Sequence, residues 1–292
     1  MGAFLNNADT IDGGDGSDTI TVTAVTATAL TNVTNVETLS VTGISTISLN
    51  SNLAFTSIDL SDAAAQNLTF ATGYTTPTTV NLKSAVSTDT IINTADLAMT
   101  VDATSADAIT GTMTITGDAT TTLDAIIMTA GDATTGTTND DGTAAFTNVT
   151  NVNTVTIRKG ADAGDDVVLT LGASTTAMTI DASALTDAGT VDAADLTNDS
   201  DSILALTAVA TLDLNVTGGA GRDTFDFAAT LTNTDIINGG AGTDTLTVLG
   251  AADTDFIGVT NVETLTLGSA ALATLGSFAS GAGITTVNVF AG

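Results

Sequence analysis

The chain has no cysteine, no histidine and no tryptophan, and its only proline is Pro77. Without these side chains it forms no disulfide, no Cys/His zinc site and no histidine-based catalytic centre. Aromatic residues make up 3% of the chain, and four residues are basic: Lys83, Arg158, Lys159 and Arg222. A saccharide-cleaving solenoid needs clustered carboxylates in a cleft, or a basic residue that acts as the base. We therefore expect that the protein is not an enzyme.

The shortage of basic residues leaves a formal net charge of −29, because 33 side chains are acidic. Such a polyanion repels nucleic acid and anionic lipid surfaces and attracts divalent cations. Many of these carboxylates could equally serve only to solvate the surface. Since the sequence has no run of about 18 apolar residues, we expect no membrane insertion. The N-terminus also lacks the pattern of a signal peptide.

The abundant residues favour strands. Hydrophobic residues account for 43% of the chain, its mean hydropathy is +0.37, and Thr occupies 64 positions. Short apolar or alternating runs recur between Gly, Asp, Asn and Ser at a spacing of roughly ten residues, which is typical of strands. We predict an all-β fold, a parallel β-solenoid that runs as one continuous domain through residues 1–292. Coils of about 20 residues would give roughly 14 coils and a rod on the order of 70 Å long.

Two segments near the ends of the chain are near copies of each other at an offset of 226 residues. Residues 13–22 align without a gap on residues 239–248, and residues 33–39 align on residues 259–265. A looser copy of the Gly-Asp turn lies at residues 218–226, and the V-T-N-V half recurs alone at residues 147–155. This shared context predicts that Asn35, Asn151 and Asn261 take equivalent places at strand starts, bond neighbouring backbone groups and bind no metal.

All three Gly-Asp turns fit the pattern G-G-x-G-x-D-x-U-x, in which U is a large apolar residue. The glycines permit a positive-φ backbone that turns carbonyl oxygens inward, and Asp supplies the hard anionic oxygen that Ca²⁺ prefers. The pattern resembles the calcium-binding nonapeptide of RTX proteins. The resemblance implies that Ca²⁺ is the bound ion and that the calcium segments are residues 9–43 and 218–267.

The candidate metal ligands follow from these turns. Asp223 and Asp244 lie 21 residues apart, about one coil, so their turns should stack at one edge with an ion between them. Asp9 and Asp235 lie in truncated copies and belong to the opposite edge, where Asp253 follows Asp235 by 18 residues but Ala27 stands at the matching place of the first copy. We expect a second-edge ion near Asp235 rather than near Asp9. The predicted set is Gly13, Asp15, Gly16, Asp18, Gly218, Gly221, Asp223, Asp235, Gly239, Gly242, Asp244 and Asp253.

Two other groups of Asp residues leave a structural and a metal-binding interpretation open. An apolar-Asp-small pattern occurs at residues 58–61, 101–104, 180–183 and 191–194, where a capped turn and a metal ligand are alternatives. Acidic loops at residues 139–142, 162–166 and 195–201 could hold further calcium or none.

The G-G-x-G-x-D turns, the V-T-N-V-E-T-L strands and the I-D-A-S corners together resemble the RTX-type surface-layer proteins of Gram-negative bacteria. The resemblance implies a secreted structural protein at the bacterial cell surface. It also implies assembly with copies of itself into a two-dimensional lattice or filament, with cell-surface polysaccharide as a further partner. Because Asp9 opens within a truncated repeat, we expect the chain to be a fragment of a longer one.

An alternative function fits the same composition: a calcium-stiffened extender or ligand-binding segment of a secreted RTX adhesin, including the ice-binding type. Thr-x-Thr runs such as residues 19–23 and 112–116 could form a flat ladder. Ladders of that kind need one strict period over many coils, which this chain does not keep. Threonine that merely fills solvent-facing strand positions is the favoured explanation of the runs.

Overall fold

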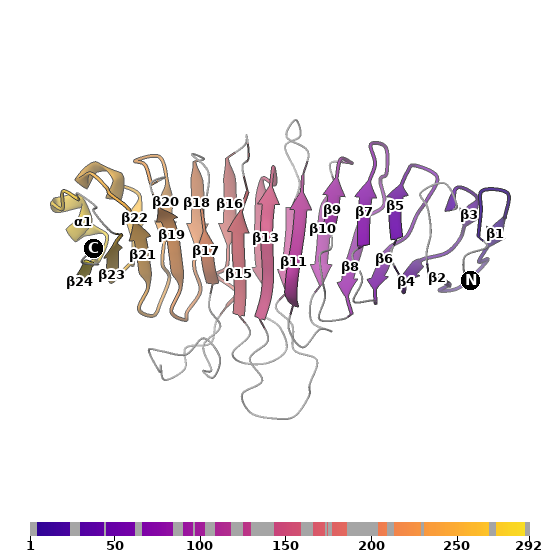
Figure 1. The fold of residues 1–292 in the computed structure, drawn as a ribbon, viewed down its shortest axis with the longest axis horizontal. Coiled ribbons are helices and arrows are strands. Elements are labelled where there is room, and N and C mark those ends of the chain that lie inside the picture. Colours follow the sequence, from indigo (N-terminus) through magenta and orange to yellow (C-terminus); the bar gives the residue numbers. More distant parts are fainter. Residues whose placement is uncertain are drawn as a thin grey trace, which may run out of the picture.

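The strands of the chain stack into an elongated parallel β-solenoid (Figure 1). The computed structural model describes residues 5–23, 30–43, 45–61, 66–83, 90–95, 97–102, 109–117, 125–129, 143–158, 166–172, 174, 177–185, 204–208, 213–228, 231–268 and 273–289. Every strand pair is parallel. The predicted fold class is thereby confirmed.

Two long sheets form the body, and successive strands alternate between them, except that the last two both belong to one sheet. The even sheet contains β2 (Thr19–Val22), β4 (Thr38–Val41), β6 (Ser57–Leu60), β8 (Thr78–Leu82), β10 (Met99–Asp102), β12 (Ala125–Thr129), β14 (Thr154–Arg158), β16 (Met178–Asp181), β18 (Leu214–Thr217), β20 (Ile236–Asn238) and β22 (Val259–Thr260). The odd sheet contains β5 (Ser45–Leu49), β7 (Gln66–Phe70), β9 (Thr90–Asn93), β11 (Ile109–Thr116), β13 (Thr143–Thr150), β15 (Asp166–Leu171), β17 (Leu204–Thr207), β19 (Thr224–Ala228), β21 (Thr245–Val248), β23 (Thr264–Leu267) and, last, β24 (Thr286–Val289). A small separate pair, β1 (Ile11–Asp12) and β3 (Val33–Thr34), continues the alternation on the odd side at the N-terminal end.

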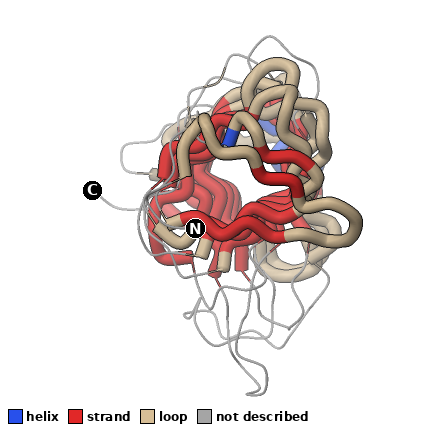
Figure 2. Tube along the Cα trace, turned by 90° about the vertical axis from the view of Figure 1, so that its right-hand side faces the viewer, coloured by secondary structure: helices blue, strands red, loops and turns tan. Residues whose placement is uncertain are grey.

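The core fills the space between the two sheets because side chains of a strand alternate between its faces. In β2, Ile20 and Val22 are buried whereas Thr19 and Thr21 are exposed. The same alternation recurs in β21 and β23. Viewed along the long axis, the strands lie over one another and the loops protrude from the stacks (Figure 2). The core is therefore a column that lengthens with each added coil.

The prediction of roughly 14 coils of about 20 residues is wrong, because each long sheet has 11 strands in the described residues and the coils in the middle are longer than 20 residues. Coils in the middle of the chain are longer than those near its ends. Thr116 pairs with Thr150, and Thr170 pairs with Thr207, whereas Thr245 pairs with Thr264. A single coil length therefore does not describe the whole chain.

Two helical elements with described bounds lie in the C-terminal part. A 3-10 turn, η2 (Asp253–Phe256), precedes β22, and a short helix, α1 (Ser277–Gly281), precedes β24. Val262 donates its N–H to the carbonyl of Ala282, so the turn after α1 packs on the coil that contains β22. No helix in the described parts of the chain is long and apolar enough to cross a membrane.

The two near copies lie half a coil out of phase. β2 follows the Gly13–Asp18 turn and belongs to the even sheet, whereas its counterpart β21 follows the Gly239–Asp244 turn and belongs to the odd sheet. The first turn therefore connects an odd-side strand to an even one, and the second connects an even strand to an odd one. The two turns lie on opposite edges of the solenoid, at opposite ends of it.

The three Asn residues of the V-T-N-V segments share one backbone conformation, with φ values of 50°, 53° and 52° at Asn35, Asn151 and Asn261. Each lies in a turn directly after a strand rather than at the start of one. Asn tolerates this left-handed region better than most residues. The prediction that the amides bond the backbone is wrong for two of them. Asn35 Nδ2 donates to Asp12 Oδ1, and Asn261 Nδ2 donates to Asn238 Oδ1, both at 2.8 Å.

Substitution of Asn261 should separate conformation from hydrogen bonding. Asn261→Val should destabilise the C-terminal coils by about 2–3 kcal/mol, because a β-branched residue is strained at positive φ and the interstrand bond is lost. Asn261→Gly keeps the conformation and should cost about 1 kcal/mol. Urea unfolding measures both changes, and equal losses in the two variants would contradict the role assigned to φ.

Candidate metal centre

The turns at residues 218–223 and 239–244 stack directly, as the 21-residue spacing of Asp223 and Asp244 predicts. Ala241 donates its N–H to the carbonyl of Gly219 at 3.0 Å, and Asp223 donates its N–H to Asp244 Oδ1 at 2.8 Å. Gly240 and Gly242 have φ values of 104° and 115°. A Cβ at either position would collide with a carbonyl oxygen of the turn below. Glycine is thus required both by conformation and by the close approach of the two backbones.

The register of the strands stacks acidic side chains in two columns. Asp223, Asp244 and Glu263 precede Thr224, Thr245 and Thr264, which pair in register, and we call them the C-terminal column. Asp18 and Glu37 precede the paired Thr19 and Thr38 and form the N-terminal column. In each column an N–H of one coil donates to the carboxylate of the next. Asp244 N–H donates to Glu263 Oε2 at 2.9 Å, and Asp18 N–H donates to Glu37 Oε2 at 2.8 Å.

Each column contains one buried carboxylate oxygen that accepts no hydrogen bond from any residue that the structure describes. These atoms are Oδ2 of Asp18 and Oδ2 of Asp244. Asp244 is 1% exposed. Both oxygens point over the first glycine of their own turn, Gly13 or Gly239, where a Cβ would collide with them. A buried anionic oxygen without a donor is costly unless a proton or a cation compensates it.

The residue before each turn explains why these oxygens lack a donor. Gly14 donates its N–H to Asp12 Oδ1, and Gly240 donates its N–H to Asn238 Oδ1, each at 3.2 Å. Because these two glycine N–H groups donate to the side chains before the turn, they do not donate to the carboxylates of Asp18 and Asp244. In the third turn Thr217 stands at this place, and Gly219 N–H donates to Asp223 Oδ2 at 2.5 Å instead.

Burial raises the pKa of Asp244 from 3.8 to about 8. The N–H of Asp223 lowers this pKa, while the negative charges of Asp223 and Glu263 raise it further. A carboxyl group in these surroundings is neutral at neutral pH unless a cation joins it.

The columns fit a calcium ion in the type of their donors. Ca²⁺ takes six to eight oxygen ligands, and each column offers carboxylates beside the carbonyl groups of tightly curled glycine turns. No group of three or more acidic side chains in the described ranges converges into a cage. Carbonyl oxygens of the turns and water would therefore have to complete any coordination shell.

Asp235 and Asp253 have a different environment from the columns, because backbone groups occupy their oxygens. Asp235 is fully buried, and it accepts the N–H of Leu214 on Oδ1 and that of Thr232 on Oδ2 at 2.9 and 2.8 Å. Asp253 Oδ1 accepts the N–H of Gly276 at 2.8 Å and of Ala279 at 3.1 Å. The bond from Ala279 and those from neighbouring N–H groups, against an opposing effect of burial, lower the pKa of Asp253. Both carboxylates act as caps on backbone groups, and nothing in their contacts points to an ion.

Asp9 repeats the contact of Asp235 in part. Its Oδ2 accepts the N–H of Asn6 at 2.9 Å, as Asp235 accepts that of Thr232. Asp15 is exposed and Gly16 adopts a φ of 126°. Gly218 lies under Asp223 Oδ2 as Gly239 lies under Asp244 Oδ2, and Gly221 supplies the carbonyl that Gly242 approaches. The turn residues of the predicted set thus gather in two separate groups, one near each end of the rod, whereas Asp235 and Asp253 lie away from the columns.

The other acidic groups divide into described and undescribed ones. Asp181 Oδ1 accepts the N–H of Ser183 at 3.0 Å, which is the capped turn expected from the structural interpretation. Asp59 instead lies within β6 and accepts a bond from Asn81 at 2.6 Å. The corner at residues 191–194 and the acidic loops at 139–142 and 195–201 lie outside the described residues, as does all of 162–166 except Asp166.

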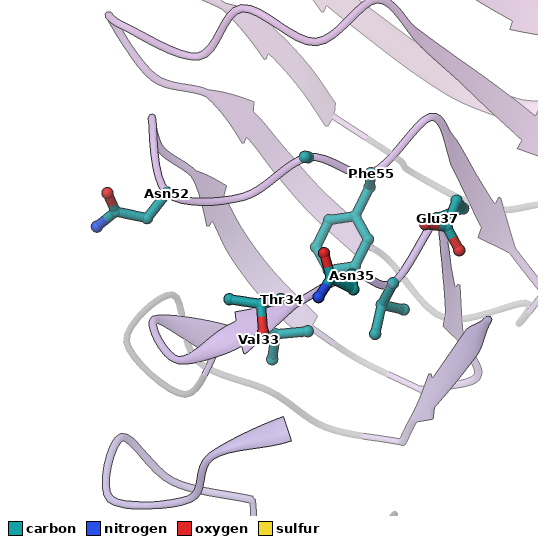
Figure 3. A pocket seen from close by; sticks show the side chains of 8 residues that line it. Val33, Thr34, Asn35, Glu37, Asn52 and Phe55 are labelled. Carbon is teal, nitrogen blue, oxygen red and sulfur yellow. The ribbon is translucent and has the colours of Figure 1, made fainter. Parts of the chain in front are cut away.

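A surface hollow of about 260 Å³ adjoins the N-terminal column (Figure 3). Glu37 and Asn35 line it from one coil, and Asn52 and Phe55 line it from the next. Glu37 thus lies between Asp18 and a space open to solvent.

No known protein-family profile, curated protein sequence or solved structure matches this chain. The interpretation of the columns therefore rests on their geometry and chemistry.

Sequence reasoning missed Glu37, Glu263, Asp12 and Asn238. The V-T-N-V-E segment was interpreted only as a strand with an Asn, although its Glu completes a column. The available signal was composition, because Glu37 and Glu263 are the only two glutamates in the chain. Asp12 and Asn238 were identifiable as equivalent polar residues directly before the glycines.

The raised pKa of Asp244 predicts how stability of the metal-free protein varies with pH. The folded state binds this proton more tightly than the unfolded state, so stability falls as pH rises from about 4 to about 8 and this contribution is constant above that. Asp244→Asn should remove that part of the pH dependence. Urea midpoints of chelator-treated protein across this range measure it, and identical pH profiles for the two proteins would contradict the assignment.

Proposed function

We propose that this protein is a secreted, calcium-binding structural protein of the bacterial cell surface that assembles with copies of itself into a surface layer. The observation that carries the calcium part is the buried, donor-free oxygen in each carboxylate column. A divalent cation supplies the positive charge that these oxygens lack. Calcium suits them because every candidate ligand is a hard oxygen.

Bound calcium would stabilise the coils at both ends of the rod. A ligand that binds only the folded state contributes RT ln(1 + [L]/Kd), about 2.7 kcal/mol per site at a hundredfold excess over Kd. Two or more such sites are comparable with the roughly 5–15 kcal/mol stability of an ordinary domain. The ions also remove repulsion within a chain whose net charge is −29.

The last described strand leaves one edge of the odd sheet without a described neighbour. Among the described strands, β24 has one neighbour, β23, and it terminates the odd sheet. All four of its residues are exposed, including Val287 and Val289. An edge strand presents unpaired N–H and C=O groups to which a further strand can add. Acidic faces can approach one another only if cations neutralise them, so assembly as well as folding should require calcium.

The alternative, an adhesin segment that uses a flat threonine face, has one observation in its favour. Thr19, Thr38, Ser57, Thr79 and Thr100 follow one another in register along the outside of the even sheet. The adjacent column contains Thr21, Ser40, Asp59, Asn81 and Asp102. Since two of these five residues are acidic, the face is not a uniform threonine surface, and the structural proposal is preferred.

Removal of calcium should loosen the rod and dissolve its assemblies. In an EGTA titration, circular dichroism should lose β signal and electron microscopy should lose ordered sheets, whereas Mg²⁺ at equal concentration should not restore them. Monomers that keep β signal and gain stability in Ca²⁺ would favour the adhesin segment. Persistence of both the β signal and the sheets at nanomolar free calcium would refute the proposal.

A further inference from the structure

The two glutamates of the chain occupy one specific structural position. Of the 33 acidic residues only Glu37 and Glu263 are glutamate, and the rest are aspartate. Each lies in a V-T-N-V-E segment, 19 residues after the Asp of a Gly-Asp turn. Each also receives the N–H of that Asp on Oε2. A chain that otherwise uses aspartate thus places its two longer carboxylates beside its two donor-free ones.

The use of the longer glutamate side chain at this position has a geometric reason. The turn between β3 and β4 consists of residues 35–37, whereas the Gly-Asp turn of the preceding coil consists of residues 13–18. The shorter turn follows a tighter path, and its side chain has to reach back to the N–H of Asp18. In the C-terminal column, Asp244 makes the same contact to Asp223 from a long turn with an aspartate side chain.

A third V-T-N-V turn supplies a comparison. At residues 149–155 the chain has the same positive-φ Asn151, and Asn153 stands at the place of Glu37 and Glu263. Its backbone contact is retained, since Thr179 N–H donates to the carbonyl of Asn153 as Ser57 N–H donates to that of Glu37. No G-G-x-G-x-D turn lies in the sequence of the preceding coil. Glutamate is therefore present in the two V-T-N-V turns that follow a G-G-x-G-x-D turn by one coil. At the third, where Asp124 precedes Ala125 in a different sequence context and lies outside the described residues, asparagine stands instead.

We propose that Glu37 and Glu263 are metal ligands, so that Asp18 with Glu37, and Asp244 with Glu263, each form the carboxylate pair of one Ca²⁺ site. This rests on the proposed calcium-binding function and adds to it residues from outside the glycine-rich turn. Oδ2 of Asp244, in a residue 1% exposed, and buried Oδ2 of Asp18 are the ligand atoms that have no other partner among the described residues. The V-T-N-V-E segment is then half of a two-coil site, and each site joins a turn to the coil that follows it.

The competing explanation is that each Glu merely accepts an N–H bond. A glutamine retains a side-chain oxygen for that bond and loses only the negative charge. Glu→Gln therefore leaves a purely structural role intact and weakens a metal site. The two sites lie at opposite ends of the rod, so each single variant keeps the other site as an internal reference.

The test measures calcium stoichiometry and affinity by calorimetry and equilibrium dialysis on the full chain. Glu263→Gln and Glu37→Gln should each remove one ion or weaken it at least tenfold, and the double variant should show both losses. Asp226→Asn is the matched control, because exposed Asp226 on β19 accepts the N–H of Ala228 and its substitution also removes one charge. Calcium binding by this control should equal that of the unmodified protein.

The possible results are distinct. If Asp244→Asn loses an ion while Glu263→Gln binds like the control, the glutamate assignment is overturned and the proposed function stands. If the unmodified chain binds no calcium at millimolar concentration, both fail. Circular dichroism in the presence of calcium checks each fold. If Glu263→Gln does not fold, Glu37→Gln decides the assignment by itself, because its site lies in another part of the rod.

Discussion

The interstrand hydrogen bonds of the parallel sheets fix the position of every other group in this molecule. They place each residue above its counterpart in the next coil, at about 4.8 Å, as Thr224, Thr245 and Thr264 show. Such stacking buries apolar residues against one another and so stabilises the fold. Phe225, Leu246 and Leu265, for example, form one continuous row in the core. Carboxylates in the same arrangement repel, so Asp223, Asp244 and Glu263 require compensation that the backbone supplies only in part.

Much of the stacked arrangement of strands and turns follows from the local sequence. Strict alternation in runs such as T-I-T-V identifies strands and their buried faces, and the 226-residue offset identifies the equivalent turns down to single hydrogen bonds. The stacking of Asp223 on Asp244 was predictable because their spacing is one coil. The partners of Asp235 and Asp253 were not predictable, since the N–H donors of Leu214 and Gly276 come from other coils whose lengths the sequence pattern does not define.

Which of the two sheets the strand of each copy joins depends on the number of strands between the two copies. An offset in residues does not give the number of strands between the two copies, because the coils that contain Thr116 and Thr170 are longer than the others. Glu263 escaped notice for a different reason. Its neighbours match a strand pattern closely, and only the register of β21 and β23 shows which residues its charge faces.

Because the two copies lie half a coil out of phase, the two carboxylate columns lie at diagonally opposite corners of the rod. The donor-free oxygen of Asp18 lies toward one edge at one end, and that of Asp244 lies toward the other edge at the other end. Two rods that meet edge to edge and point the same way can bring the two kinds of turn together only with a stagger of nearly a rod's length. Rods that point in opposite directions bring them together without stagger. Contact between one turn of each kind in two neighbouring rods therefore requires either that stagger or opposite directions.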